Sequence, residues 1–148
     1  MYLVDTNVLS VGAPTKVVPS PALIDWMDQN SGHLFVSVIT IAEIEEGIAK
    51  ARRHGAFSQA ERLAEWLETV LHLYSSHILM LDIPVARLVG GLADQARGAG
   101  LSPDLADLAI AATARRYGYT ILTRTLRRFA GFGVPLHDPF IALPEDAP

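Results

Sequence analysis

The stretch that decides the fold is Tyr2-Leu3-Val4-Asp5-Thr6-Asn7, in which three apolar residues are followed by three polar ones. A short apolar run that ends in turn-forming residues is typical of a buried strand. Four further segments have the composition of strands, and we predict them at residues 34–36, 78–81, 119–123 and 134–136. The last of these is short and should lie at an edge of the sheet.

Helical patterns fill the intervals between these strands. Ile41, Ile44 and Ile48 recur at helical spacing and form one apolar stripe. Ser102-Pro103-Asp104 is a favourable helix start, with a capping serine, a proline in the first turn and an acid at the positive end of the helix dipole. The predicted helices span residues 22–29, 40–53, 57–73, 84–97 and 102–117, and a proline-containing loop covers residues 11–21. Strands alternating with helices indicate an α/β fold with a mainly parallel sheet, in a single domain over residues 1–148.

Composition restricts both the compartment and the chemistry. Half of the residues are hydrophobic, which is enough for a substantial core, but no run of about 18 apolar residues could span a membrane. The N-terminus has no signal-peptide pattern, and the absence of cysteine suits the reducing cytoplasm, where we expect the protein. A cysteine nucleophile and a thiolate zinc site are excluded. A Gly-rich phosphate loop and a Gly-x-Ser-x-Gly motif are also missing, so other side chains must supply the chemistry.

Two acidic residues follow strands at the end where a parallel sheet places its functional site. Asp5 comes directly after the first strand, although it could equally form a turn or cap a helix. Glu43 lies near the start of the helix after the second strand. Its alternative role is in a capping box, in which the carboxylate would accept from the backbone N–H of Thr40. Both alternatives stay open at this point.

Asp107 is the most informative acid, because it is the only polar residue between Leu105 and Ala112. A carboxylate in such apolar surroundings is costly unless a metal ion or an arginine pairs with it. The alternative is an acid that reaches water past small alanines. Asp104 lies three residues earlier on the same helix face, where it could instead interact with the helix dipole.

Basic residues gather near the C-terminus, although the formal net charge is −4. They could form a solvated helix face and loop, or a patch that contacts phosphates on an otherwise acidic protein. The residues concerned are Arg115, Arg116, Arg124, Arg127 and Arg128.

Four segments, in order along nearly the whole chain, resemble the motifs of PIN-domain proteins. They are Leu3-Val4-Asp5-Thr6-Asn7-Val8-Leu9-Ser10, Ser37-Val38-Ile39-Thr40-Ile41-Ala42-Glu43, Ala106-Asp107-Leu108-Ala109-Ile110-Ala111-Ala112-Thr113-Ala114, and residues 119–124 followed by Phe129. Size and detail are most similar to the toxin nucleases of VapBC-type toxin–antitoxin pairs, especially the FitB-like branch.

The resemblance implies a small three-layer α/β/α sandwich with a central parallel sheet that cleaves RNA endonucleolytically. Asp5, Glu43 and Asp107 would then be the catalytic carboxylates around Mg²⁺ or Mn²⁺. Thr6 and Asn7 would support them at the strand end and contact the substrate. Magnesium prefers hard oxygen ligands, and a bound ion can polarise a phosphate and activate a water molecule.

One position departs from the family pattern. Relatives often have a fourth acid just after the Thr-Arg of the fourth motif, and Thr125 stands there in this chain. Threonine is a poorer metal ligand, so the number of metal ions, one or two, stays open. Asp104 could partly compensate as a metal ligand. Arg124, Arg127 and Arg128, together with Thr125, would contact the RNA.

The same resemblance implies an antitoxin protein and a second copy of the chain as partners. Antitoxins of such pairs can insert a basic side chain into the acidic site. Apolar residues on helices 40–53 and 57–73 would be antitoxin contacts or core, and core fits the isoleucines better. Two alternatives remain: a PIN-fold binding module with weak catalysis, which Thr125 favours, and a DNA nuclease. A phosphatase would have a second aspartate where Asn7 stands.

Overall fold

The computed structural model describes residues 1–14 and 20–145, so the predicted loop at 11–21 lies partly outside the described residues. Its centre is a five-stranded sheet in the order β3-β2-β1-β4-β5. Every neighbouring pair of strands is parallel. The strands are β1 (Tyr2–Val4), β2 (Leu34–Ser37), β3 (Ile78–Leu79), β4 (Thr120–Leu122) and β5 (Leu136–His137). The predicted α/β class with a parallel sheet is therefore confirmed, and β5 is an edge strand as expected.

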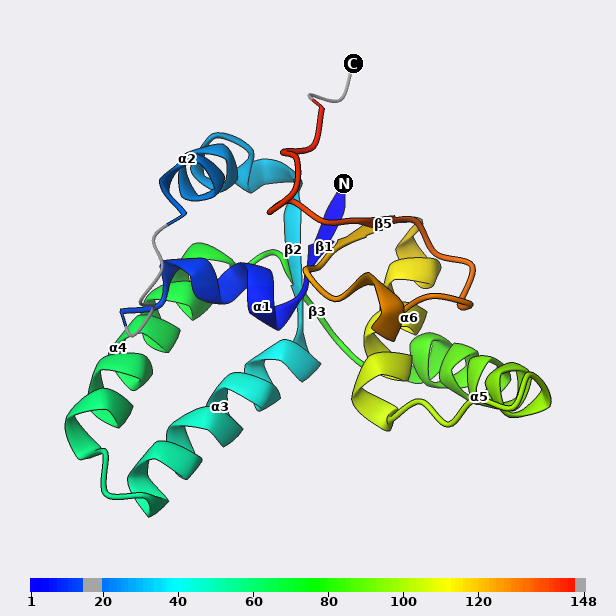
Figure 1. Cartoon of the computed structure of the whole chain (residues 1–148), viewed down its shortest axis with the longest axis horizontal. Helices are drawn as coiled ribbons and strands as arrows, with labels where there is room; N and C mark the ends of the chain where they lie inside the picture. Colours follow the sequence, from blue (N-terminus) through cyan, green and yellow to red (C-terminus); the bar gives the residue numbers. More distant parts are fainter. Residues whose placement is uncertain (15–19, 146–148) are drawn as a thin grey trace.

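Helices cover both faces of the sheet and complete the predicted three-layer sandwich. Figure 1 shows α1 to α4 on one side of the sheet and α5 and α6 on the other. The helices are α1 (Thr6–Leu9), α2 (Pro21–Gln29), α3 (Val38–Arg53), α4 (Phe57–Leu73), α5 (Ile83–Gly98) and α6 (Leu105–Tyr117), with short 3₁₀ turns at Ser10–Gly12, Ser31–His33 and Leu126–Arg128. Within the described residues, none of these helices is long and apolar enough to cross a membrane.

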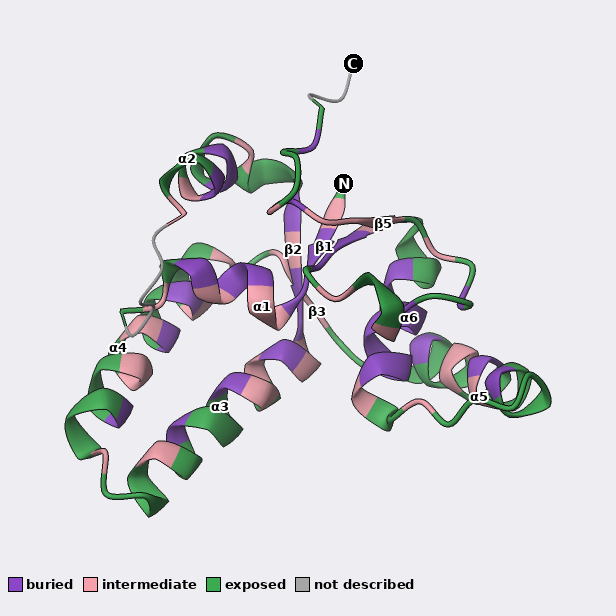
Figure 2. Cartoon of the chain, in the orientation of Figure 1, coloured by how far each residue is buried: buried purple, intermediate pink, exposed green. Residues whose placement is uncertain are grey.

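Two apolar cores lie on opposite faces of the sheet, because successive strand residues point to opposite sides. Val4 and Leu122 belong to the core under α1 to α4, whereas Leu3 and Ile121 belong to the core under α5 and α6. The isoleucine stripe of α3 lies in the first core, where Ile44 and Ile48 are buried and Ile41 is partly buried. These isoleucines are therefore core, the interpretation that the sequence favoured. Figure 2 shows buried, purple residues on both α3 and α6.

The two helices that hold the predicted acids begin at other residues than expected. Helix α6 starts at Leu105, and its capping residue is Asp104, whose carboxylate accepts from the backbone N–H of Asp107 at 2.9 Å. The prediction of a Ser102 cap followed by proline is wrong, because an aspartate with extended backbone is available closer to the apolar run.

Helix α3 starts at Val38, and its cap is the side chain of Ser37, which accepts from the backbone N–H of Ile39 at 3.1 Å. Thr40 therefore lies inside the helix, where it is buried, and the predicted start at Thr40 is wrong. A further difference follows β1, where a polar turn was expected at residues 5–7 and the structure has the short helix α1 (Thr6–Leu9). The Asp5 carboxylate begins that helix by accepting from the backbone N–H of Thr6.

Candidate active site

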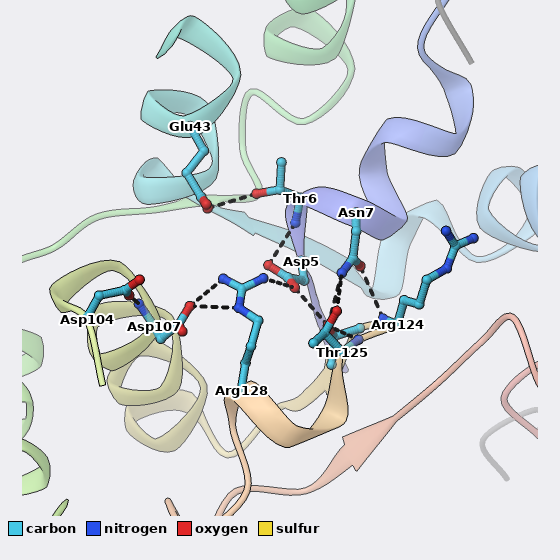
Figure 3. Close-up of polar contacts among 10 residues, drawn as sticks. Asp5, Thr6, Asn7, Glu43, Asp104, Asp107, Arg124, Thr125 and Arg128 are labelled. Atoms are coloured by element: carbon cyan, nitrogen blue, oxygen red, sulfur yellow. Dashed lines mark hydrogen bonds and ion pairs between the residues drawn. The ribbon is translucent and has the colours of Figure 1, made fainter. Parts of the chain in front are cut away.

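The carboxyl ends of the central strands bring the predicted acids to one region. Asp5 directly follows β1, Glu43 lies in the second turn of α3 after β2, and Asp107 lies in the first turn of α6. Figure 3 shows Glu43, Asp5 and Asp107 on three different elements, with their carboxylates around the end of the Arg128 side chain. Residues more than 100 positions apart thus meet at one edge of the sheet, as expected for a parallel sheet.

Asp5 is a fully buried carboxylate that is held through both of its oxygens. Oδ1 accepts from the backbone N–H of Thr6 at 2.9 Å, and Oδ2 accepts from the hydroxyl of Thr123 at 2.8 Å. Oδ2 also accepts from Nη1 of Arg128 at 3.3 Å. Because burying an unpaired charge is costly, this set of donors both fixes Asp5 and makes its burial possible.

Asp107 is also buried, and its partner in the structure is the same arginine. Its Oδ1 accepts from Nε of Arg128 at 3.1 Å and also from Nη2. Arg128 comes from the 3₁₀ turn after β4, and its side chain lies between the two aspartates (Figure 3). The hydrogen bond to Asp107 raises the pKa of Arg128 most, and the nearby charges of Asp5 and Glu43 raise it further, although burial opposes them. The guanidinium therefore stays charged.

Glu43 does not make the capping box that its sequence permits. Its Oε1 accepts from the hydroxyl of Thr6 at 2.9 Å, which turns the carboxylate toward Asp5 instead of back along α3. Burial raises the pKa of Glu43 most, and the charges of Asp5 and Asp107 raise it further, while the Thr6 hydrogen bond and Arg128 lower it. Glu43 thus shares one electrostatic environment with the two aspartates.

A polar network joins the ends of β1 and β4 beside Asp5. The side-chain oxygen of Asn7 accepts from the backbone N–H of Arg124 at 3.1 Å. The Asn7 amide donates to the hydroxyls of Thr123 and Thr125, both at 3.4 Å. Asn7 therefore supports the site through the backbone and hydroxyls of the neighbouring strand end.

Thr123 is a site residue that the sequence patterns did not indicate. It is fully buried, and its hydroxyl donates to Asp5 and accepts from the backbone N–H of Thr125 at 3.1 Å. The signal that could have found it is its position, since a threonine directly after β4 must lie beside the residue that directly follows β1.

The remaining predicted site residues are placed differently. Asp104 is exposed and caps α6 without contacting Arg128. Arg124 is exposed, and its guanidinium lies 3.8 Å from the centre of the Phe140 ring, a cation–π contact. Arg127 is exposed beside Arg128. Arg115 and Arg116 lie in the last turn of α6, at the opposite end of the helix from Asp107. The five arginines near the C-terminus therefore do not form one patch.

Comparison with known proteins agrees with this geometry. A family model of the PIN domain matches residues 2–130. This chain belongs to the PIN-domain family. Toxin FitB of Neisseria gonorrhoeae is 32% identical to it over 142 residues, which are 95% of this chain and 99% of that protein. VapC ribonuclease Y4jK of Sinorhizobium fredii is 32% identical over 143 residues, 95% of this chain and 98% of that protein. The crystal structure of FitAcB from Neisseria gonorrhoeae superposes with a TM-score of 0.81 at 32% identity, over 95% of this chain and 99% of that one.

The donors of this PIN-domain site suit a hard divalent cation. Asp5 and Asp107 each direct a carboxylate oxygen at the same positive group, so an ion in place of that guanidinium would meet two oxygen ligands. In this structure, however, residues 1–14 and 20–145 contain no group of three acidic, histidine or cysteine side chains arranged to hold a metal. The side chain of Arg128 lies in the gap between Asp5 and Asp107.

Proposed function

We propose that this PIN domain is a Mg²⁺- or Mn²⁺-dependent endoribonuclease and the toxin of a type II toxin–antitoxin pair. The observation that supports this most directly is the convergence of Asp5 and Asp107 on one positive charge, with Glu43 beside them. Such an arrangement is what a metal-dependent phosphodiesterase needs, since the developing charge on a phosphate must be matched by a cation held on carboxylates. The names of the relatives, a toxin and a VapC ribonuclease, support the same substrate class.

In the proposed mechanism, a bound divalent ion would polarise the scissile phosphate and lower the pKa of an attacking water molecule. The residues of the chain position these reactants. Thr6 and Thr123 hold the Asp5 carboxylate in a fixed orientation, and the capped first turn of α6 holds Asp107. Glu43, once deprotonated, adds a third carboxylate on the side of Thr6. Fixed ligands matter because misplacement of a metal or water by about 1 Å can cost about 100-fold in rate.

We propose that the exposed arginines beside the site bind the phosphates of the RNA. Arg124 follows β4, where Asn7 fixes its backbone, and Arg127 lies on the adjacent 3₁₀ turn. Both side chains are exposed on a protein whose net charge is −4, so they provide a local attraction for RNA that the whole molecule lacks. Thr6, Asn7 and Thr125 are proposed to contact the substrate at the same edge.

A second candidate function is a PIN-fold binding module with weak or no cleavage. Arg128 favours it, because this side chain already neutralises two of the three carboxylates. In that case, the site would be a structural ion-pair network, and the chain would work by contact with a partner.

Cleavage of RNA by the purified, antitoxin-free protein decides between these two functions. A mixed RNA pool is incubated with Mg²⁺, with Mn²⁺ and with EDTA, beside D107N and the control D94N, which alters an exposed aspartate on α5. We expect metal-dependent cleavage by the wild type and D94N but not by D107N. A well-folded wild type that leaves RNA from several sources intact would refute the nuclease. Parallel reactions with single- and double-stranded DNA test the DNA nuclease alternative.

We also propose an antitoxin protein and a second copy of the chain as partners, in the cytoplasm. The solved structure that is 32% identical to this chain is that of FitAcB from Neisseria gonorrhoeae. Toxin FitB of the same organism matches 95% of this chain. Light scattering of the purified chain should give about twice the mass of 16.0 kDa. A monomer at micromolar concentration would refute the homodimer.

A further inference from the structure

Arg128 occupies the gap between Asp5 and Asp107 where the proposed function needs a divalent cation. We infer that the guanidinium of Arg128 and the metal ion are alternative occupants of this gap, so that Arg128 is a built-in counter-ion that lowers metal affinity. The inference rests on the proposed function only in the identity of the cation. It predicts that metal enters this site by exchange with a side chain of the same molecule.

Arg128 contacts the carboxylate oxygens that a metal ion would use. Three N–H-bearing atoms of one guanidinium, Nε, Nη1 and Nη2, are directed at one oxygen of Asp107 and one oxygen of Asp5. These contacts use the carboxylate oxygens that face the gap, since the remaining oxygen of Asp5 accepts from the backbone of α1. A divalent ion on the same oxygens would lie next to the positive guanidinium, and the two charges would repel each other strongly in a partly buried site. They cannot share the gap.

Of the three paired side chains, that of Arg128 is the one that can leave the gap. The Asp5 side chain is completely buried and that of Asp107 is 11% exposed, whereas the Arg128 side chain is 30% exposed. The backbone of the 3₁₀ turn is anchored by the buried ring of Phe129, so a long side chain can turn outward without moving it. Because leaving the buried aspartates without a cation is costly, departure of Arg128 and arrival of metal are coupled.

The pairing with the two aspartates is specific to Arg128. Within the described residues, the two ion pairs of the chain are both made by Arg128, one with each of these aspartates. Arg127, the next residue along the same turn, is exposed and makes neither contact. The guanidinium is therefore specifically placed at the site, and Arg127 provides a matched control.

Titration of the metal-free protein with Mn²⁺, followed by calorimetry, tests the inference without any enzymatic readout. We expect R128Q to bind Mn²⁺ about tenfold tighter or more than the wild type, because the competing charge-assisted hydrogen bonds are removed. R127Q should bind like the wild type. R128K keeps the charge but lacks the planar fork that contacts both aspartates, so its affinity should lie between the two.

Thermal unfolding with and without Mn²⁺ gives an independent measurement. R128Q should unfold at a lower temperature than the wild type without metal, since two carboxylates lose their partner, and Mn²⁺ should raise its Tm more than it raises that of the wild type. If R128Q does not fold without metal, R128K is titrated in its place and must still bind more tightly than the wild type.

Two outcomes would overturn the inference, and they differ in what they say about function. Equal Mn²⁺ affinity in wild type, R127Q, R128K and R128Q, together with metal-dependent RNA cleavage by the wild type, would refute the exchange but keep the proposed nuclease. No Mn²⁺ binding by any of these variants and no cleavage by the wild type would refute both.

Discussion

The hydroxyl of Thr123 donates to Oδ2 of Asp5 at 2.8 Å and thereby connects the carboxyl ends of the adjacent strands β4 and β1. Both residues are fully buried, and the same Asp5 oxygen also contacts Arg128. Thr123 is therefore a positioning residue, because it acts on a phosphate or metal only through Asp5. This relationship makes the orientation of the central carboxylate depend on the packing of two strands.

Replacing Thr123 by valine should weaken the site while keeping the shape of the side chain. We expect a loss of about 1–3 kcal/mol in the free energy of unfolding, because a buried carboxylate loses a donor. Mn²⁺ affinity should fall about 10- to 100-fold, as for other residues that orient metal ligands. Denaturant unfolding and calorimetry measure the two effects. The same substitution at the exposed Thr69 is the control. Unchanged Mn²⁺ affinity in T123V would mean that Asp5 does not depend on this donor.

Substitutions of Asp104 separate its cap from its predicted role as a metal ligand. D104A should lower the free energy of unfolding by about 1 kcal/mol, because α6 loses the acceptor for the backbone N–H of Asp107. D104N should keep the stability, since asparagine caps helices as well as aspartate. Urea unfolding of both variants measures this. A lower Mn²⁺ affinity in D104N at unchanged stability would assign Asp104 to the metal site as well.

The raised pKa of Glu43 predicts a pH dependence of stability in the metal-free protein. In the interval between the ordinary value of 4.5 and the raised value, the folded state binds more protons than the unfolded state. The free energy of unfolding should therefore decrease as the pH rises through that interval, where Glu43 becomes charged in its half-buried position. The E43Q variant should lack this decrease, and E45Q, on the exposed face of the same helix, should retain it. Urea unfolding at a series of pH values measures the slope, and an identical slope in E43Q would contradict the assignment to Glu43.

Salt dependence of RNA binding tests the exposed arginines at the site. Binding is measured in the D107N background, which we expect not to cleave. R124E and R127E should each reduce the slope of log K against log salt by about 1, because one phosphate contact is lost. R115E, at the far end of α6, should leave the slope unchanged. If R124E and R127E keep the slope of the D107N protein that has all its arginines, Arg124 and Arg127 are surface charges without a role in RNA binding.

Much of the fold follows from local patterns that need no knowledge of tertiary contacts. Apolar runs that stop at polar residues predicted β1 and β2, and the isoleucine stripe predicted the buried face of α3. The alternation of strands and helices implied a parallel sheet, and that topology alone placed Asp5 and Glu43 near one edge. The apolar neighbours of Asp107 correctly indicated that this carboxylate must be paired.

The caps, the partners and the supporting residues depended on the tertiary structure. Ser37 and Asp104 cap their helices because the backbone is extended at those two residues. Other nearby residues have side chains that can cap a helix, so the sequence did not indicate which of them would have the extended backbone. The sequence allowed either a metal ion or an arginine beside Asp107, and it did not indicate which arginine could reach it; the turn after β4 directs Arg128 to Asp107 across 21 residues of chain. Short-range periodicity specifies elements and their buried faces, but a charge pair between distant segments is determined only when strand order and turn geometry fix where each side chain ends.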